Sequence, residues 1–315
     1  MPPYVNVTVL GSGGVMPTPE RGTPAILVET WNGLTILLDA GEGVQSRLRL
    51  AGRSPESLDY VVLTHEHGDH VNGLAGLLQS MAVSKRRRKL TIIGPRPAIE
   101  FALDALEATG SRLGFPVDYI IVSGSGSLVL LEKGGDIVRL DWFPVCHTPH
   151  SLGYRVRVEL RPRINMERLA SLRLPPGPWI ARLLRGERVE VEGRILEPGD
   201  LLSGGGSHTI VYTGDTAPCT TVLEASRGAR VLLHDSTYDH SMEEEAIERR
   251  HSTSTHAAGI AAEAGVETLV LVHVSPRYRG VDARRLEQEA RLLHPRTILS
   301  WDGMRLRVPL APSQG

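Results

Sequence analysis

Several short apolar segments of this 315-residue chain end in a histidine or an aspartate, and this repeated arrangement constrains the fold most strongly. The apolar residues 60–63 lead directly into the sequence Thr-His-Glu-His-Gly-Asp-His at 64–70. Three other polar residues follow apolar runs in the same way: His147, Asp215 and His273. Short apolar runs bounded by turn residues are typical of buried strands. Because strand ends can gather at one edge of a sheet, we expect these side chains to share one cleft.

Strand-like and helix-like patterns alternate along the rest of the chain. Strands are predicted at 5–9, 25–29, 34–38, 60–63, 90–93, 209–212, 231–233 and 269–272. Helices are predicted at 44–51, around 74–78, and at 98–108, 242–250, 255–264 and 283–293. Two halves that each place strands and then helices favour an α/β fold with two sheets face to face and helices outside. We therefore expect a single domain over 1–315 with an insertion, built as a four-layer αββα sandwich.

The composition is that of an ordinary globular protein, with 41% hydrophobic residues, 23% charged residues and a net charge of −1. Such a chain is not a polycation that coats nucleic acid, so a local patch must hold any anionic partner. The apolar runs are much shorter than the ~20 residues that cross a bilayer, and no leader-like segment opens the sequence. The two cysteines, Cys146 and Cys219, form no CxxC pair and suit a reducing compartment. We expect a cytoplasmic protein with no membrane partner.

The segment 64–70 supplies three imidazoles and one carboxylate, from His65, His67, Asp69 and His70. A single histidine is usually structural, but four such groups at this spacing indicate a metal site. Nitrogen and carboxylate oxygen without thiolate suit Zn²⁺, and less specifically Mn²⁺ or Fe²⁺. The sequence therefore predicts a metal centre to which the later strand ends also contribute.

Asp39 belongs to the same set because it follows the apolar residues 36–38. Histidines that bind metals normally donate their second N–H group to a carboxylate or a carbonyl, and Asp39 is a candidate acceptor. An aspartate in the sequence Asp-Ala-Gly can equally well cap a turn. The sequence does not decide between these two roles.

These residues resemble the metallo-β-lactamase superfamily, and within it the short, single-domain ribonuclease Z family of tRNA 3′-processing endoribonucleases. The motif at 64–70 marks only the superfamily. The likeness to ribonuclease Z depends on further motifs along nearly the whole chain: Leu-Gly-Ser-Gly at 10–13, Leu-Asp-Ala-Gly-Glu at 38–42, Gly-Tyr-Arg at 153–155, Pro-Pro-Gly-Pro at 175–178, Tyr-Thr-Gly-Asp-Thr at 212–216, His-Ser-Thr at 251–253 and Ser-Pro-Arg-Tyr at 275–278.

The resemblance implies two zinc ions per chain, with Mn²⁺ as another possible metal. The first ion would be bound by His65, His67 and His147, and the second by Asp69, His70 and His273. Asp215 would bridge the two ions, which together would activate water for cleavage of a phosphodiester. Asp69 would also accept the proton of that water as general base.

The resemblance also implies that His251 contacts the scissile phosphate or helps to protonate the leaving oxygen. The alternative is that it only opens a helix starting at Ser252 or Ser254. The expected substrate is precursor tRNA, cut to leave a 3′-hydroxyl on the tRNA and a 5′-phosphate on the trailer, by an enzyme that is typically a homodimer. Two positions depart from the family pattern. Glu66 stands where an apolar residue is common, and Asp235 replaces the usual glutamate, so the reach of its shorter side chain is in question.

The segment 160–188 is predicted to be an inserted basic arm. Over 161–188 it carries seven arginines against two glutamates, which leaves the rest of the chain with a net charge of −6. Concentrated positive charge of this kind fits binding to a phosphate backbone. In the ribonuclease Z family the matching arm grips the elbow of tRNA, so we expect four arginines to bind it: Arg168, Arg173, Arg182 and Arg185. The basic run 85–89 fits either a phosphate contact or a solvated surface.

Two other functions compete with this interpretation. A small-molecule hydrolase of the same fold, such as a phosphodiesterase, an arylsulfatase or a lactonase, would have the same metal motif but no use for the arm. A non-catalytic RNA-binding protein on a degenerate fold would not need all seven metal-binding residues. The sequence does not decide the cleavage position, the native metal or the oligomeric state.

Overall fold

A computed structural model describes residues 3–310, which fold into two seven-stranded sheets that face each other. The first sheet has the order β18-β1-β2-β3-β4-β5-β6. Its strands are β1 (Tyr4–Gly11), β2 (Ala25–Thr30), β3 (Thr35–Leu38), β4 (Tyr60–Val62), β5 (Leu90–Gly94), β6 (Val117–Ile121) and β18 (Arg305–Pro309). Strands β3 to β6 run parallel, and β18, β1, β2 and β3 pair antiparallel.

The second sheet has the order β17-β16-β15-β14-β9-β8-β7. Its strands are β7 (Gly126–Lys133), β8 (Asp136–Pro144), β9 (Leu152–Leu160), β14 (Gly206–Tyr212), β15 (Val231–Asp235), β16 (Thr268–Val272) and β17 (Thr297–Leu299). Strands β14 to β17 are parallel, and the others pair antiparallel. Each sheet therefore contains a block of parallel strands whose carboxyl ends can present polar side chains.

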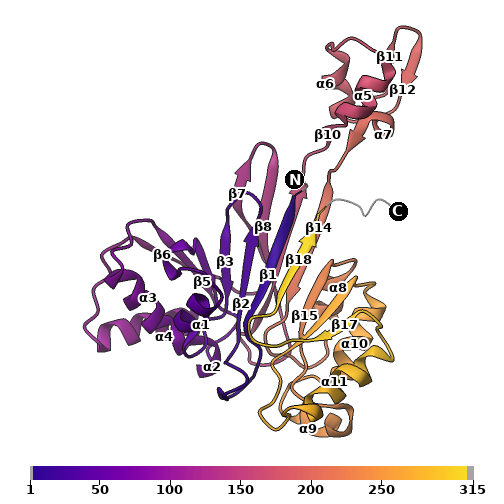
Figure 1. Ribbon diagram of the computed structural model, residues 1–315. Helices are drawn as coiled ribbons and strands as arrows, with labels where there is room; N and C mark the ends of the chain where they lie inside the picture. Colours follow the sequence, from indigo (N-terminus) through magenta and orange to yellow (C-terminus); the bar gives the residue numbers. More distant parts are fainter. Residues whose placement is uncertain (1–2, 311–315) are drawn as a thin grey trace.

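Helices cover the outer face of each sheet, which completes the predicted four layers (Figure 1). The first sheet is flanked by α1 (Val44–Leu50), α2 (Gly68–Val71), α3 (Gly73–Val83) and α4 (Arg96–Ala108). The second is flanked by α8 (Thr220–Ser226), α9 (Glu243–Glu248), α10 (Ser254–Glu263) and α11 (Val281–Arg291). Short 3-10 turns lie at Pro55–Ser57 and His240–Met242. The αββα prediction is confirmed. Within residues 3–310, no helix combines the length and the apolar character needed to cross a bilayer.

The main core lies between the sheets, where alternate strand residues point inward. Val5, Val7 and Val9 of β1 share one buried cluster with Val156 and Val158 of β9. Burial of such side chains stabilises the sandwich by roughly 1.5–3 kcal/mol each. Two further clusters join each sheet to its own helices. The sheets are also tied near the motif, where the buried Tyr154 hydroxyl donates to the carbonyl of Leu63 at 2.8 Å.

The inserted segment stands away from the sandwich and is longer than predicted (Figure 1). It consists of β10 (Arg163–Ile164), α5 (Met166–Leu172), α6 (Trp179–Leu184), β11 (Val189–Val191), β12 (Arg194–Leu196), α7 (Pro198–Leu201) and β13 (Leu202–Ser203). We call residues 163–203 the arm. The predicted end at 188 falls inside it, because β10 pairs with β13 and Val189, Leu196 and Leu201 complete its own small core.

The full arm is also less basic than the segment 161–188. Residues 163–203 contain seven arginines against six carboxylates. The additional acidic side chains lie in the second half of the arm, on β11 and α7 and in the turns beside them. The excess of positive charge therefore lies in residues 163–188.

The helix predicted at 242–250 is shorter in the structure. α9 ends at Glu248, and Arg250 then adopts a positive φ of 57°. That conformation ends a right-handed helix and turns the chain toward His251.

Candidate metal centre

All seven predicted metal-binding residues meet at one edge of the sandwich. His65 and His67 follow β4, and Asp69 and His70 lie on α2. Three more residues follow strands of the second sheet: His147 after β8, Asp215 after β14 and His273 after β16. Apart from β8, these strands belong to the parallel blocks, and ligands of such sheets bind at the carboxyl ends of the strands. The fold therefore brings the two halves of the sequence together here.

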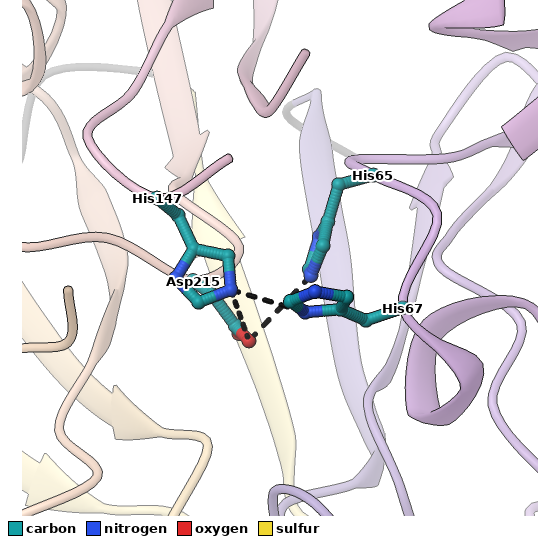
Figure 2. A group of neighbouring side chains, drawn as sticks. All are labelled: His65, His67, His147 and Asp215. Carbon is teal, nitrogen blue, oxygen red and sulfur yellow. Dashed lines mark hydrogen bonds and ion pairs between the residues drawn. The ribbon is translucent and has the colours of Figure 1, made fainter. Parts of the chain in front are cut away.

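His65, His67, His147 and Asp215 form a first group whose candidate ligand atoms all lie within 4.8 Å of one another. Figure 2 shows the three imidazoles turned toward the carboxylate. The Nε2 atom of His147 lies 3.1 Å from Nδ1 of His67 and 3.8 Å from Oδ2 of Asp215. The Nε2 atom of His65 lies 3.7 Å from the same Oδ2.

Asp69, His70, Asp215 and His273 form a second group within the same limit of 4.8 Å. Here the other oxygen of Asp215 is used, since Oδ1 lies 3.2 Å from Nε2 of His70 and 3.2 Å from Nε2 of His273. Asp69 Oδ2 lies 3.3 Å from Nε2 of His273. Asp215 thus turns one oxygen to each group, which is the arrangement a bridging carboxylate needs.

Several polar atoms that face this centre are better suited to binding a metal ion than to hydrogen bonding with one another. Nε2 of His65, Nε2 of His70 and Oδ1 of Asp215 are buried and have no hydrogen-bond partner among residues 3–310. Buried polar atoms are rarely left unpaired, and one cation in each group would satisfy all three. The donor set contains only imidazole nitrogen and carboxylate oxygen, which suits zinc.

Asp39 orients the centre from the first sheet. Its Oδ2 accepts from Nδ1 of His70 at 2.7 Å and from the hydroxyl of Tyr212 at 2.8 Å. Its Oδ1 accepts from the amide of Thr64 at 2.8 Å, and the Thr64 hydroxyl lies 2.9 Å from Nδ1 of His65. Asp39 has a positive φ of 61°, so its backbone lies in a turn. Its carboxylate does not cap that turn, because the amide of Gly41 donates to the carbonyl of Pro24 instead. The contacts therefore favour the role of histidine acceptor over that of turn cap.

Asp235 and Thr237 orient histidines from the second sheet, as Asp39 and Thr64 do from the first. Asp235 Oδ2 lies 2.8 Å from Nδ1 of His251, so the shorter side chain does reach this ring. The Thr237 hydroxyl donates to Asp235 Oδ1 at 2.7 Å and lies 2.8 Å from Nδ1 of His273. Burial would lower the pKa of His251, but the charge and hydrogen bond of Asp235 raise it to about 9. Among the protein's own charges, His251 therefore favours the imidazolium form at neutral pH.

The carboxylates of the centre are held in the ionised form. Burial alone would raise the pKa of Asp69, but the charge of His70 and the hydrogen bond with His273 keep it below the ordinary value. Burial opposes ionisation of Asp215 too, yet the nearby His273 and His70 lower its pKa strongly. Ionised carboxylates are the forms that bind metal.

The centre opens to solvent through a hollow of about 580 Å³. Its lining combines the candidate ligands with Val15, Asn72, Tyr238, Arg249 and His251. The His251 ring is stacked on that of His273, with 5.1 Å between centroids, and lies 4.8 Å from the ring of His147. His251 also precedes the capped start of α10 at Thr253. A ligand bound at the metal centre would therefore lie within reach of the His251 side chain.

Comparison with known proteins places the chain in a family. The Metallo-beta-lactamase superfamily matches residues 18–161. A ribonuclease Z of Aeropyrum pernix is 47% identical over 307 residues, which cover 97% of this chain and 99% of the relative. A ribonuclease Z of Ignicoccus hospitalis is 40% identical over 294 residues, covering 93% and 95%. The chain belongs to the ribonuclease Z family.

Solved structures agree on the fold of this ribonuclease Z family member. The crystal structure of human tRNase Z, short form, matches with a TM-score of 0.67 at 22% identity, covering 96% of this chain and 99% of that one. The αββα sandwich predicted from the sequence is thus also the fold of a known tRNase Z.

The four arginines predicted to bind tRNA are exposed and lie far from the metal centre. The arm leaves the sandwich where β9 ends and β14 begins, whereas the centre lies beyond the other end of β14. The seven residues of β14 span about 20 Å at ~3.3 Å each. Arg182 and Arg185 both pair with Glu187 at 2.8 Å, and Arg168 Nη1 donates to the carbonyl of Gly199 at 3.3 Å.

The basic run 85–89 is mostly engaged within the protein. Arg86 is only 4% exposed, and its guanidinium donates to the carbonyls of Glu56 and Leu58 at 2.5 and 2.7 Å. Arg88 pairs with Asp59, and Lys89 pairs with Asp118 at 2.8 Å. These contacts favour a structural role for most of the run over a phosphate contact.

Sequence reasoning missed the hydroxyl groups that orient the histidines. Thr64 precedes the metal motif, and Thr237 follows Asp235 by two residues, so their neighbours in the sequence gave a signal for both. Tyr212 gave none, because its contact with Asp39 joins residues 173 positions apart. Arg250 was also missed. Its carbonyl lies 2.9 Å from Nδ1 of His147, while its guanidinium donates to the His147 carbonyl at 2.9 Å.

Proposed function

We propose that this protein is a zinc-dependent endoribonuclease that removes the 3′ trailer from precursor tRNA. Relatives named ribonuclease Z, similar over nearly the full length, support the activity. The geometric observation that carries the proposal is Asp215, whose two oxygens face two separate groups of ligand-type atoms. Two metal sites sharing one carboxylate suit hydrolysis of a phosphodiester.

The proposed ligands follow the two groups around Asp215. His65, His67 and His147 would hold one Zn²⁺, and Asp69, His70 and His273 the other. Zinc bound there would supply Lewis-acid charge for the phosphodiester and an activated water. Mn²⁺ is the alternative metal, because the same donor atoms accept it.

Within this proposal the protein's own groups move the protons. Asp69 is ionised, faces the hollow and can accept a proton from the attacking water. The carboxylate of Asp235 favours a proton on the His251 ring, so His251 can donate to the leaving oxygen or contact the scissile phosphate. The products would be a tRNA with a 3′-hydroxyl and a trailer with a 5′-phosphate.

The arm is proposed to bind the substrate away from the cut. Arg168, Arg173, Arg182 and Arg185 are exposed on its more basic half, where guanidinium groups suit phosphate oxygens. The family resemblance further suggests a homodimer working in the cytoplasm. Sedimentation of the purified chain would test the dimer.

Incubating the purified protein with one precursor tRNA and mapping the new 3′-end tests the proposed function. We expect a single cut at the junction between tRNA and trailer, lost after chelation and restored by Zn²⁺ or Mn²⁺. Cleavage of small phosphodiesters, sulfate esters or lactones without cleavage of precursor tRNA would replace the proposal with a small-molecule hydrolase.

A further inference from the structure

The loop after β1 contains an unusual backbone conformation beside the metal centre. Val15 has a φ of 68°, and the amide of Met16 donates to the carbonyl of Gly14 at 2.8 Å, which closes a three-residue turn around Val15. Turns of this kind with positive φ are rare and strained. A β-branched residue is among the least suited to positive φ, where glycine and asparagine are usual. Such strain persists where the surroundings enforce it, often at functional sites.

The surroundings of Val15 do enforce it, because the loop is fixed on both sides of the turn. Gly14 donates to the carbonyl of Val274 at 3.1 Å, and a Cβ atom on Gly14 would lie only 2.3 Å from the His273 ring. Farther along the loop, Arg21 Nη1 donates to Ser12 Oγ and to the Ser300 carbonyl, both at 2.7 Å. The loop therefore has little freedom to relax the turn.

The turn gives Val15 two different contacts. Its amide donates to Oδ2 of Asp69 at 2.8 Å, which any residue except proline could do. Its side chain takes no part in that bond, and the residue belongs to the lining of the hollow above the metal centre. Val15 is 60% exposed and the adjacent Met16 is 56% exposed. Folding therefore gains little from apolar side chains here.

We propose that Val15 and Met16 form an apolar lip that contacts a nucleobase next to the scissile phosphate. This inference rests on the proposed function, since it requires RNA in the hollow. A phosphate at the centre places its neighbouring nucleotides at the rim, and an exposed apolar surface contacts the face of any base. The lip would then position the RNA without selecting its sequence, because every base has a π-face.

The first test replaces the apolar side chain and keeps the backbone amide. Val15→Asn introduces a residue that tolerates positive φ, so we expect an unchanged or higher melting temperature. We expect kcat/KM for precursor tRNA to fall about tenfold, and to fall by a clearly larger factor than kcat/KM for bis(p-nitrophenyl) phosphate, which has no neighbouring nucleobase. Val15→Ile keeps an apolar lip and should retain processing. Val83→Asn changes a valine that is 83% exposed on α3 and should have no effect on processing.

The second test identifies the base. Precursor tRNAs with an abasic nucleotide on either side of the cut should show, on one side, a loss of about tenfold with the unaltered protein. With Val15→Asn, the ratio of kcat/KM for the intact substrate to that for the abasic substrate should fall toward one, because the contact is already gone.

The proposal is overturned if, on each side of the cut, the abasic nucleotide lowers kcat/KM by the same factor in the unaltered protein and in Val15→Asn. An equal loss on tRNA and on the small phosphodiester would also overturn it, and would assign Val15 to holding Asp69. If the unaltered protein does not cut precursor tRNA, the proposed function itself fails.

Discussion

The metal centre and the arm are built in opposite ways. Side chains at the centre come from both sheets and are fixed by buried partners, as Asp39 fixes His70 and Thr237 fixes His273. The arm stands away from the sandwich on a core of six buried residues, and its arginines lie on the surface. The difference indicates that chemistry requires fixed geometry, whereas binding at a distance requires reach and charge.

The charges follow the same division. At the centre, burial and close partners shift pKa values strongly, as for Asp215 and His251. In the arm, Glu187 pairs with both Arg182 and Arg185 on the exposed surface, where an ion pair contributes little to stability. Such pairs can open to let an arginine bind a phosphate instead. Replacements in the two regions should therefore have different consequences.

The largest effect is expected from Asp69→Ala at the centre. The protein should stay folded, while kcat for precursor tRNA and for a small phosphodiester falls by orders of magnitude, because a metal ligand and the proposed base are lost together. Single-turnover kinetics with circular dichroism as the folding control would measure it. Retention of more than about a tenth of kcat, a loss below ~1.4 kcal/mol, would remove Asp69 from the mechanism.

Deleting the arm should affect one substrate only. Residues 163–203 are replaced with a short Gly-Ser linker, because an earlier end would leave Val189, Leu196 and Leu201 without their core. We expect kcat/KM for precursor tRNA to fall by about 10²-fold or more as remote binding energy is lost. Cleavage of bis(p-nitrophenyl) phosphate should persist. Unchanged tRNA processing would mean that the arm is not a binding site.

A smaller loss is expected from Asp235→Asn, which leaves the His251 ring without its charged partner. We expect kcat for precursor tRNA to fall about 10- to 100-fold with a nearly constant KM. Asp235→Glu should keep activity, because glutamate is the residue the family pattern has here. Full activity of Asp235→Asn would show that the contact of 2.8 Å has no catalytic value.

The smallest effects should come from the arm arginines, compared in pairs. Arg168 and Arg173 have no carboxylate partner in the described part of the chain, unlike Arg182 and Arg185. Replacing the first pair with alanine should weaken tRNA binding several-fold. It should also flatten the slope of log affinity against log salt by up to ~0.9 per lost phosphate contact. The second pair should matter less, and a reversed order in a binding titration would contradict the role given to Glu187.

Sequence reasoning worked for the strand ends that form the centre. His147, Asp215 and His273 each follow an apolar run, and parallel strands bring their carboxyl ends together. The hydrogen bonds behind these residues could not be predicted in the same way. The contact from Tyr212 to Asp39 depends on how the two sheets face each other, which no local pattern encodes.

The arm was predicted less well for a physical reason. Its helices α5, α6 and α7 have seven, six and four residues, which is too short for a helical period to stand out. Its basic composition marked where it begins but not where it ends. Its end is set by the pairing of β10 with β13, and two strands of two residues each are too short to show a strand pattern.

The metal content of the purified chain tests the two-ion centre directly. Elemental analysis should find about two zinc or manganese ions per chain, because each oxygen of Asp215 faces its own group of ligands. Asp215→Ala should bind clearly fewer ions while keeping its fold. An unchanged metal content in Asp215→Ala, or a single ion in the unaltered protein, would contradict the bridged centre.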